Sequence, residues 1–144
     1  MSIIFSRQCE YALQAIFLLA QQKQGTMMSI RELARRLKIP YHFLAKILQD
    51  LSRKGFLDSR RGPTGGFSLA RPAGEISLYQ IIAAIDGENF MQDCILGFGE
   101  CTSANACAFH EGWLPTRESL HKLLTSEHLD RITTRMKKPE YRLG

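Results

Sequence analysis

The chain has 144 residues, of which 44% are hydrophobic and 23% are charged, and its formal net charge at pH 7 is +5. This length and composition are typical of one soluble globular domain, or of a small domain with an appended segment. They argue against a membrane-spanning protein, because no apolar run approaches about 18 residues. The N-terminal residues lack the pattern of a signal peptide, so we expect a cytoplasmic protein whose thiols are kept reduced.

The positive charge is concentrated in one segment of the chain. Residues 31–71 hold ten Lys or Arg and three acidic residues, a net charge of +7, whereas the rest of the chain has a net charge of −2. Residues 72–116 contain no Lys or Arg. A concentrated basic segment is typical of a protein that binds a polyanion, although a basic face that contacts only water has the same composition.

Helical periodicity and capping signals predict a helix-turn-helix motif in this segment. A first helix is expected upstream of it, over residues 5–22. Ser29 and Glu32 form a capping-box pattern before a short helix, which ends before Pro40 because proline disfavours helix in the residue that precedes it. Pro40 suits the first turn of the next helix, and Gly55 ends that helix. Its expected buried residues are Phe43, Leu44, Ile47, Leu48 and Leu51.

A basic β-hairpin is predicted directly after the helix-turn-helix. Residues 56–57 begin one short strand, and residues 67–70 alternate apolar and small side chains in a second. The glycine-rich residues 62–66 form the turn, because glycine tolerates positive φ. This hairpin is the wing of a winged helix-turn-helix, and we expect Arg60 and Arg61 at its base.

We expect the DNA contacts to lie on the second helix of the motif and on the wing. Polar side chains on such a helix contact base edges or nearby phosphates, and arginines bind phosphates or the minor groove. The expected base or phosphate contacts are Tyr41, His42, Lys46 and Gln49, and the expected phosphate or minor-groove contacts are Arg35, Arg36, Arg53, Arg60 and Arg61. The predicted interface is completed by Ser29 of the motif and by Gly65 and Gly66 of the wing.

Three of the four cysteines, Cys94, Cys101 and Cys107, fall within fourteen residues and precede His110. The Gly, Ser, Asn and Ala residues around them indicate a loop, which lets thiolates converge on one centre. An iron–sulfur cluster, a structural zinc ion and unliganded thiols are the three alternatives. Structural zinc sites usually contain short Cys-x-x-Cys pairs, so the gaps of six and five residues favour a cluster over zinc. Cys9 lies on the apolar stripe of the first helix and is expected in the core.

Several motifs together resemble one family of bacterial regulators. They are CEYAL, the run SIRELARRLKIPYHFLAKILQDLSRKGFLDSRRGPTGGFSLARP, the segment ISLYQIIAAIDG, and three cysteines followed by a His and a Trp. This combination is similar to the Rrf2 family of winged-helix transcription regulators, which includes IscR and NsrR. The likeness extends over almost the whole chain, and its specific parts are the wing RGPTGGF and the helix start IPYHFL.

The resemblance implies a homodimer that binds a palindromic operator. A long C-terminal helix would hold the dimer, and we expect Trp113, Leu120 and Leu124 to form its contacts. The chain then divides into a winged helix-turn-helix domain (1–86), a cysteine-rich loop (87–112), dimerisation helices (113–136) and a tail that is expected to be disordered (137–144).

The resemblance also implies an iron–sulfur cluster, with two irons rather than four, that is bound by the three cysteines and by one other residue. In IscR-like members this fourth ligand is a His just after the third Cys, which matches His110. In NsrR-like members it is an acid near the N-terminus of the partner subunit, which matches Glu10. The sequence offers both residues, so both ligands remain open.

The sequence therefore predicts a mainly α, winged-helix transcription regulator whose operator affinity is controlled by a cluster that senses iron–sulfur status, nitric oxide or redox state. An enzyme is not predicted, because the chain has no Ser-His-Asp set, no phosphate-binding Gly loop before a helix and no paired carboxylates. The alternative is a regulator of the same fold with structural zinc or no metal, which responds to a small molecule or a partner protein.

Overall fold

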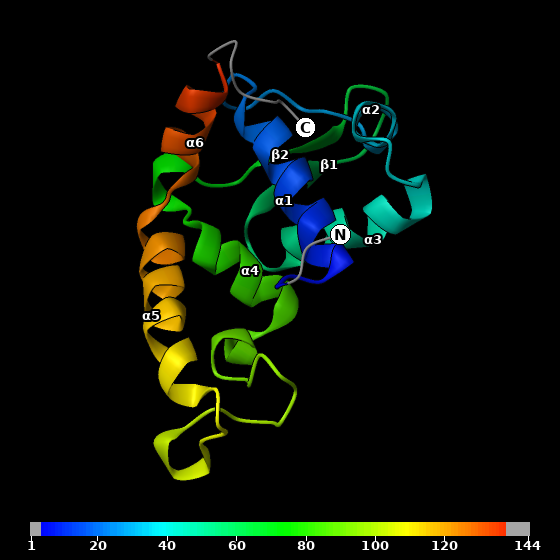
Figure 1. The fold of residues 1–144 in the computed structure, drawn as a ribbon. Helices are drawn as coiled ribbons and strands as arrows, with labels where there is room; N and C mark the ends of the chain where they lie inside the picture. The colour runs from blue at the N-terminus through cyan, green and yellow to red at the C-terminus, as the bar shows by residue number, and fades with distance from the viewer. Residues whose placement is uncertain (1–3, 138–144) are drawn as a thin grey trace.

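Residues 4–137, which the computed structural model describes, form six α-helices and one two-stranded antiparallel sheet (Figure 1). The helices are α1 (Arg7–Ala20), α2 (Ile30–Leu37), α3 (Tyr41–Arg53), α4 (Leu78–Asp86), α5 (His110–Ser126) and α6 (Leu129–Met136). The strands are β1 (Leu57–Arg60) and β2 (Gly66–Leu69), and short 3-10 turns are η1 (Ala73–Glu75), η2 (Glu88–Met91) and η3 (Ser103–Asn105). The mainly α, winged helix-turn-helix prediction is confirmed. Apart from Lys137, the tail that was expected to be disordered lies outside the described residues.

Capping serines begin α2 and α4, but only one of the two forms a complete capping box. The Ser77 hydroxyl accepts a hydrogen bond from the Gln80 N–H, and the Gln80 side chain accepts one from the Ser77 N–H, both at 3.2 Å. The Ser29 hydroxyl accepts from the Glu32 N–H at 3.1 Å. The Glu32 carboxylate, however, binds the Arg35 guanidinium at 2.9 Å. The predicted box at α2 is therefore half formed, because an i,i+3 ion pair occupies its acidic member.

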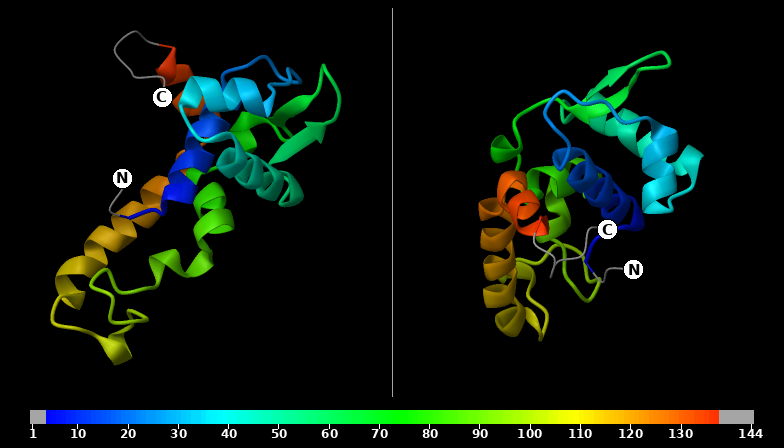
Figure 2. Two further views of the ribbon diagram at one scale, coloured as in Figure 1. Left: turned by 90° about the vertical axis from the view of Figure 1, so that its right-hand side faces the viewer. Right: turned by 90° about the horizontal axis from the view of Figure 1, so that it is seen from above.

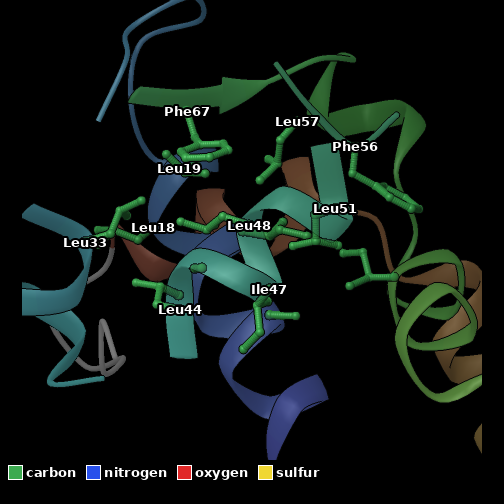
Figure 3. Packing of buried hydrophobic residues seen from close by; sticks show 14 of the residues in the cluster. Leu18, Leu19, Leu33, Leu44, Ile47, Leu48, Leu51, Phe56, Leu57 and Phe67 are labelled. Atoms are coloured by element: carbon green, nitrogen blue, oxygen red, sulfur yellow. The ribbon is translucent and has the colours of Figure 1, made fainter. Parts of the chain in front are cut away.

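The turn between α2 and α3 depends on a left-handed residue. Lys38 has φ 57° and ψ 42°, and its N–H donates to the Ala34 carbonyl. Phe43, which was expected to be buried on α3, is 45% exposed and packs edge-to-face on Tyr11, with ring centroids 5.6 Å apart. It lies at the edge of the apolar stripe, where the helical period alone does not decide burial. The residues of α3 that do enter the core are Leu44, Ile47, Leu48 and Leu51 (Figure 3).

The wing is attached to the chain segment that precedes α2. Phe67 of β2 and Met28 exchange two backbone hydrogen bonds of 2.8 and 2.9 Å. A Cβ atom on the neighbouring Gly66 would lie 2.2 Å from the Met28 carbonyl oxygen, so only glycine fits there. The strand register pairs Arg60 with Gly66 next to the turn. Arg60 and Arg61 therefore lie at the turn end of the wing, and the prediction that they lie at its base is wrong.

The C-terminal helices are joined to the winged helix-turn-helix through α4. The Leu78 N–H donates to the Glu127 carbonyl and the Leu129 N–H donates to the Ile76 carbonyl, both at 3.0 Å. From this junction α5 extends beside α4 to the cysteine loop, at the end of the molecule opposite to the wing (Figures 1 and 2). The helix begins at His110, three residues earlier than predicted. No helix within residues 4–137 has the length and apolar composition that crossing a membrane requires.

Candidate DNA interface and cysteine loop

The exposed face of α3 and the wing border one groove of about 620 Å³. Three of the predicted DNA contacts, Lys46, Gln49 and Arg53, share this groove. Tyr41 and His42 are exposed at the start of α3, where their rings meet edge-to-face with centroids 5.4 Å apart. The groove is lined by Gln8, Lys46, Gln49, Asp50, Ser52, Arg53, Ser59 and Phe67.

Ion pairs within the chain divide the basic side chains into two groups. Asp50, on α3, binds the Arg53 guanidinium at 3.1 Å and the Lys54 ammonium at 3.0 Å. Arg35 is paired with Glu32, as described above. Within residues 4–137, four predicted DNA contacts make no ion pair and keep an uncompensated charge, namely Arg36, Lys46, Arg60 and Arg61. These four cations are the best placed to bind phosphates.

Three other predicted DNA contacts have structural roles of their own. Ser29 caps α2, and Gly66 allows β2 to approach Met28. A Cβ atom on Gly65 would lie 2.1 Å from the Arg60 carbonyl oxygen, so this glycine is needed to close the turn. Contact of these residues with DNA stays a prediction.

A small hairpin at the start of the cysteine loop positions two of the thiols. The Cys94 N–H donates to the Gly99 carbonyl at 2.6 Å, and the Cys101 N–H donates to the Gln92 carbonyl at 2.7 Å. Gly97 and Gly99, with φ of 86° and 91°, let the chain reverse between them. Cys101 therefore lies at the open end of the hairpin and Cys94 lies next to its turn, with six residues between them in the sequence.

The four predicted metal-binding side chains form two pairs. The sulfur atoms of Cys94 and Cys107 are 3.9 Å apart. The Cys101 sulfur lies 3.0 Å from Nδ1 of His110, and both of these side chains are buried. A tetrahedral metal with bonds of about 2.3 Å to sulfur separates two thiolates by about 3.8 Å, so the first pair has the spacing of two ligands on one metal. In the part of the chain that the structure describes, no three His, Cys, Asp or Glu side chains converge closely enough to hold one ion.

The backbone of the hairpin stabilises the thiolate form of Cys94. Hydrogen bonds from the backbone of Phe98 and then of Leu96 lower the pKa of Cys94 below its ordinary value. Metals bind the thiolate rather than the thiol, so this environment favours ligation. The loop therefore offers three thiols and one imidazole that could hold a metal centre, and one of the thiols, Cys94, has a lowered pKa.

Cys9 lies in a different environment, and its expected place in the core is confirmed. The side chain is fully buried beside Ile82 and Leu124. Burial, with a further contribution from the charges of Asp86 and Glu10, raises the pKa of Cys9 from 9.0 to about 12. A neutral, buried thiol neither reacts readily nor binds metals.

We expect the Cys9 thiol to make folding stability depend on alkaline pH. The folded-state pKa is raised, so the stabilisation is complete below pH 9 and is lost as the pH rises towards 12. In this range the free energy of unfolding should fall by about 1.4 kcal/mol per pH unit more in the wild type than in Cys9→Ala. Urea unfolding at pH 8 to 10.5 measures the difference. Identical pH profiles of the two proteins would contradict the burial of a neutral thiol.

The helix α5 differs from the prediction in the residues that it exposes. Leu124 is only 5% exposed and packs on Cys9 and Ile82 of its own chain, with Leu120 half-buried beside it. Leu123 is 53% exposed. Leu124 therefore makes a core contact within its own chain, and Leu123 is the exposed leucine beside it. The sequence pattern did not distinguish the two, because adjacent leucines fit the same helical stripe.

Comparisons with known proteins match almost the whole chain. The family model Rrf2, described as an iron-dependent transcriptional regulator, matches residues 5–135. A relative from Aquifex aeolicus, named as an HTH-type transcriptional regulator, is 35% identical over 113 residues, which cover 77% of this chain and 78% of the relative. A relative with the same kind of name from Mycobacterium tuberculosis is 35% identical over 121 residues, covering 83% of this chain and 74% of the relative.

Two solved structures show the same fold. CymR, the global cysteine regulator of B. subtilis, has a TM-score of 0.77 at 22% identity, over 91% of this chain and 96% of CymR. IscR of T. potens has a TM-score of 0.75 at 23% identity, over 96% of this chain and 92% of IscR.

Proposed function

The chain belongs to the Rrf2 family of transcriptional regulators, whose winged-helix members bind DNA and are typically dimeric, and on that premise we propose that it binds a palindromic operator with an affinity set by an iron–sulfur cluster in the cysteine loop. Members of this family are transcriptional regulators and not enzymes. The observation that carries the proposal is the pairing of Cys94 with Cys107 and of Cys101 with His110.

Two pairs of donors suit a two-iron cluster, in which each iron takes two protein ligands. A single zinc ion needs all four donors around one point, and the described side chains do not converge in that way. His110 is therefore the fourth ligand in this proposal. Glu10, the alternative ligand, lies on α1 and is part of neither pair, and in NsrR-like members the corresponding acid comes from the partner subunit. When bound, the cluster supplies a centre that responds to oxidants, nitric oxide or loss of iron.

The helix α4 connects the cysteine loop to α3, the helix that carries the predicted DNA contacts. The Lys54 ammonium, just after α3, donates to Asp50 of α3 at 3.0 Å and also to the carbonyl of Ala84 in the last turn of α4. At the end of α4, the Asp86 carboxylate accepts a hydrogen bond from the Ser6 N–H at 3.0 Å, next to α1. The loop that carries the cysteines follows α4 directly. A change in the order of that loop can therefore reach α3 through a short series of contacts. For the cluster to regulate, the protein with its cluster and the protein without it must bind DNA with different affinities.

Anaerobic purification with iron, sulfide and zinc analysis tests the cluster. We expect iron and acid-labile sulfide in equal amounts, about two of each per chain, together with visible absorption. Cys101→Ser should lose both, whereas Cys9→Ser should keep them, because Cys9 is not a ligand. One tight zinc per chain and no sulfide would reject the cluster in favour of a structural metal site.

A second candidate function follows from the separation of the two donor pairs, which also suits unliganded thiols. In that case the protein is a regulator of the same fold that responds to a small molecule or a partner protein. Variants of Cys94, Cys101 and Cys107 would then bind and release the operator as the wild type does. The variants of the previous experiment, assayed on DNA, decide between the two candidates.

A homodimer through α5 also belongs to the proposal, and Leu123 is its expected central contact. We expect Leu123→Asp to convert a dimer into a monomer, because the substitution removes exposed apolar surface and buries a charge in the interface. Size-exclusion chromatography with light scattering measures the mass. The neighbouring Leu124→Ala should lower stability by about 2–4 kcal/mol and leave the mass unchanged. A Leu123→Asp protein with the mass of the wild-type dimer would exclude this interface.

A further inference from the structure

A pocket of about 270 Å³ lies between the first turns of α5 and the cysteine loop. Cys94 and Ile95 of the loop line one part of it, and Trp113 and Arg117 of α5 line another, one helical turn apart. The pocket therefore places a cysteine thiol in the same small space as two side chains that can donate hydrogen bonds. Neither donor has a role in the contacts described so far.

The indole of Trp113 carries a buried donor without an acceptor. Its Nε1 atom is shielded from solvent and makes no hydrogen bond in the part of the chain that the structure describes. A buried N–H that stays unpaired costs free energy, and such groups are rare in folded proteins. Asp93, the acidic residue that lines the same pocket, makes no hydrogen bond to this indole. Within residues 4–137 the indole N–H therefore has no acceptor.

Arg117 adds a positive charge to the same wall. Its Nη1 donates to the carbonyl of Cys101 at 3.1 Å, which ties α5 to the second cysteine of the loop. The side chain is half-buried, and across residues 4–137 no carboxylate pairs with it. A partly buried cation without a counter-charge favours an anion nearby. A cluster held by three thiolates and one neutral imidazole carries net negative charge, and its sulfur atoms accept hydrogen bonds.

From these contacts we infer that Trp113 and Arg117 are positioning residues of the cluster site, where the Trp113 N–H donates to a sulfur of the cluster and Arg117 balances its charge. The inference rests on the proposed function. Both groups stabilise the more negative, reduced form, so both raise the reduction potential. Trp113→Phe removes the donor and keeps an aromatic ring, whereas Arg117→Gln removes the charge and Arg117→Lys keeps it.

The test compares reduction potentials in anaerobic titrations, after iron and sulfide have been measured in every variant. We expect Trp113→Phe and Arg117→Gln to load cluster and to show lower midpoint potentials than the wild type, with Arg117→Lys close to the wild type. Phe90→Leu changes the same pocket wall without removing a donor and should leave the potential unchanged. Unchanged potentials in loaded Trp113→Phe and Arg117→Gln would overturn the inference and leave the proposed function intact, whereas a wild type without iron and sulfide would overturn both.

A second measurement needs no variant that might fail to load. Trp113 is the single tryptophan of the chain, so the emission of the wild-type protein reports on this position alone. We expect reconstitution with iron and sulfide to quench this emission, and iron chelation to restore it. Full emission from a protein with a complete cluster would place the indole away from it and overturn the role of Trp113.

Discussion

Gly66→Ala is expected to lower the free energy of unfolding by about 2–4 kcal/mol and to detach the wing from the segment that precedes α2. The new methyl group would lie 2.2 Å from the Met28 carbonyl oxygen, in backbone that already has φ +142°. The atoms that it would meet are backbone atoms of Met28 and Ser29, which have no flexible side chain to move away, so the pairing of Met28 with Phe67 must open. Urea unfolding measures the loss, and operator affinity should fall with it because the wing carries Arg60 and Arg61.

Gly62→Ala is the matched control for this substitution. Gly62 lies in the same turn with φ +101°, but no atom lies within 4 Å of the position that a Cβ would take. It should therefore cost only the backbone strain, about 1 kcal/mol. Equal losses from the two alanine variants would mean that the close approach of Gly66 to Met28 does not hold the wing.

Lys46→Glu is expected to weaken operator binding by about 10–100-fold at 0.1 M salt. Lys46 lies in the groove on the exposed face of α3 and makes no ion pair within residues 4–137, so its charge is available to DNA. The slope of log affinity against log salt should also become shallower by about 1 or more, because one phosphate contact is lost. Fluorescence anisotropy with a duplex selected from a random pool provides both numbers.

Lys122→Glu controls for the change in net charge. Lys122 is exposed on α5, outside the groove, and the substitution alters the total charge by the same amount. Its affinity for the duplex should stay within about twofold of the wild type, because screening at this ionic strength limits distant charges. If both lysine variants lost affinity equally, the binding surface would be set by overall charge and not by α3.

Local signals in the sequence predicted the DNA-binding half well. Pro40 and Gly55 mark the limits of α3, and Ser77 with Gln80 begins α4 with the capping box that the pattern indicates. The sequence pattern was less informative about burial at the edge of an apolar stripe. Phe43 lies at the edge of the stripe of α3, where it stays 45% exposed and packs on Tyr11 of α1.

The sequence predicted which sulfur and imidazole side chains the cysteine loop carries, and not how they are arranged. Spacing shows that Cys94, Cys101, Cys107 and His110 are near one another, and it does not reveal how they pair. The pairing depends on the hairpin that two positive-φ glycines allow and on a helix that begins at His110. Trp113 and Arg117 were outside the predicted metal site, because a buried indole and a lone cation carry no spacing signal.

Operator affinity measured on the same protein with and without its cluster tests the proposed regulation most directly. The experiment uses anaerobic wild-type protein, its chelated form, and Cys101→Ser carried through both treatments, all on one selected duplex. We predict that cluster removal changes the wild-type affinity by at least about tenfold, which corresponds to about 1.4 kcal/mol of coupling, and that Cys101→Ser matches the chelated form in both treatments. Equal affinity of the loaded and chelated wild type would contradict control of DNA binding by the cysteine loop.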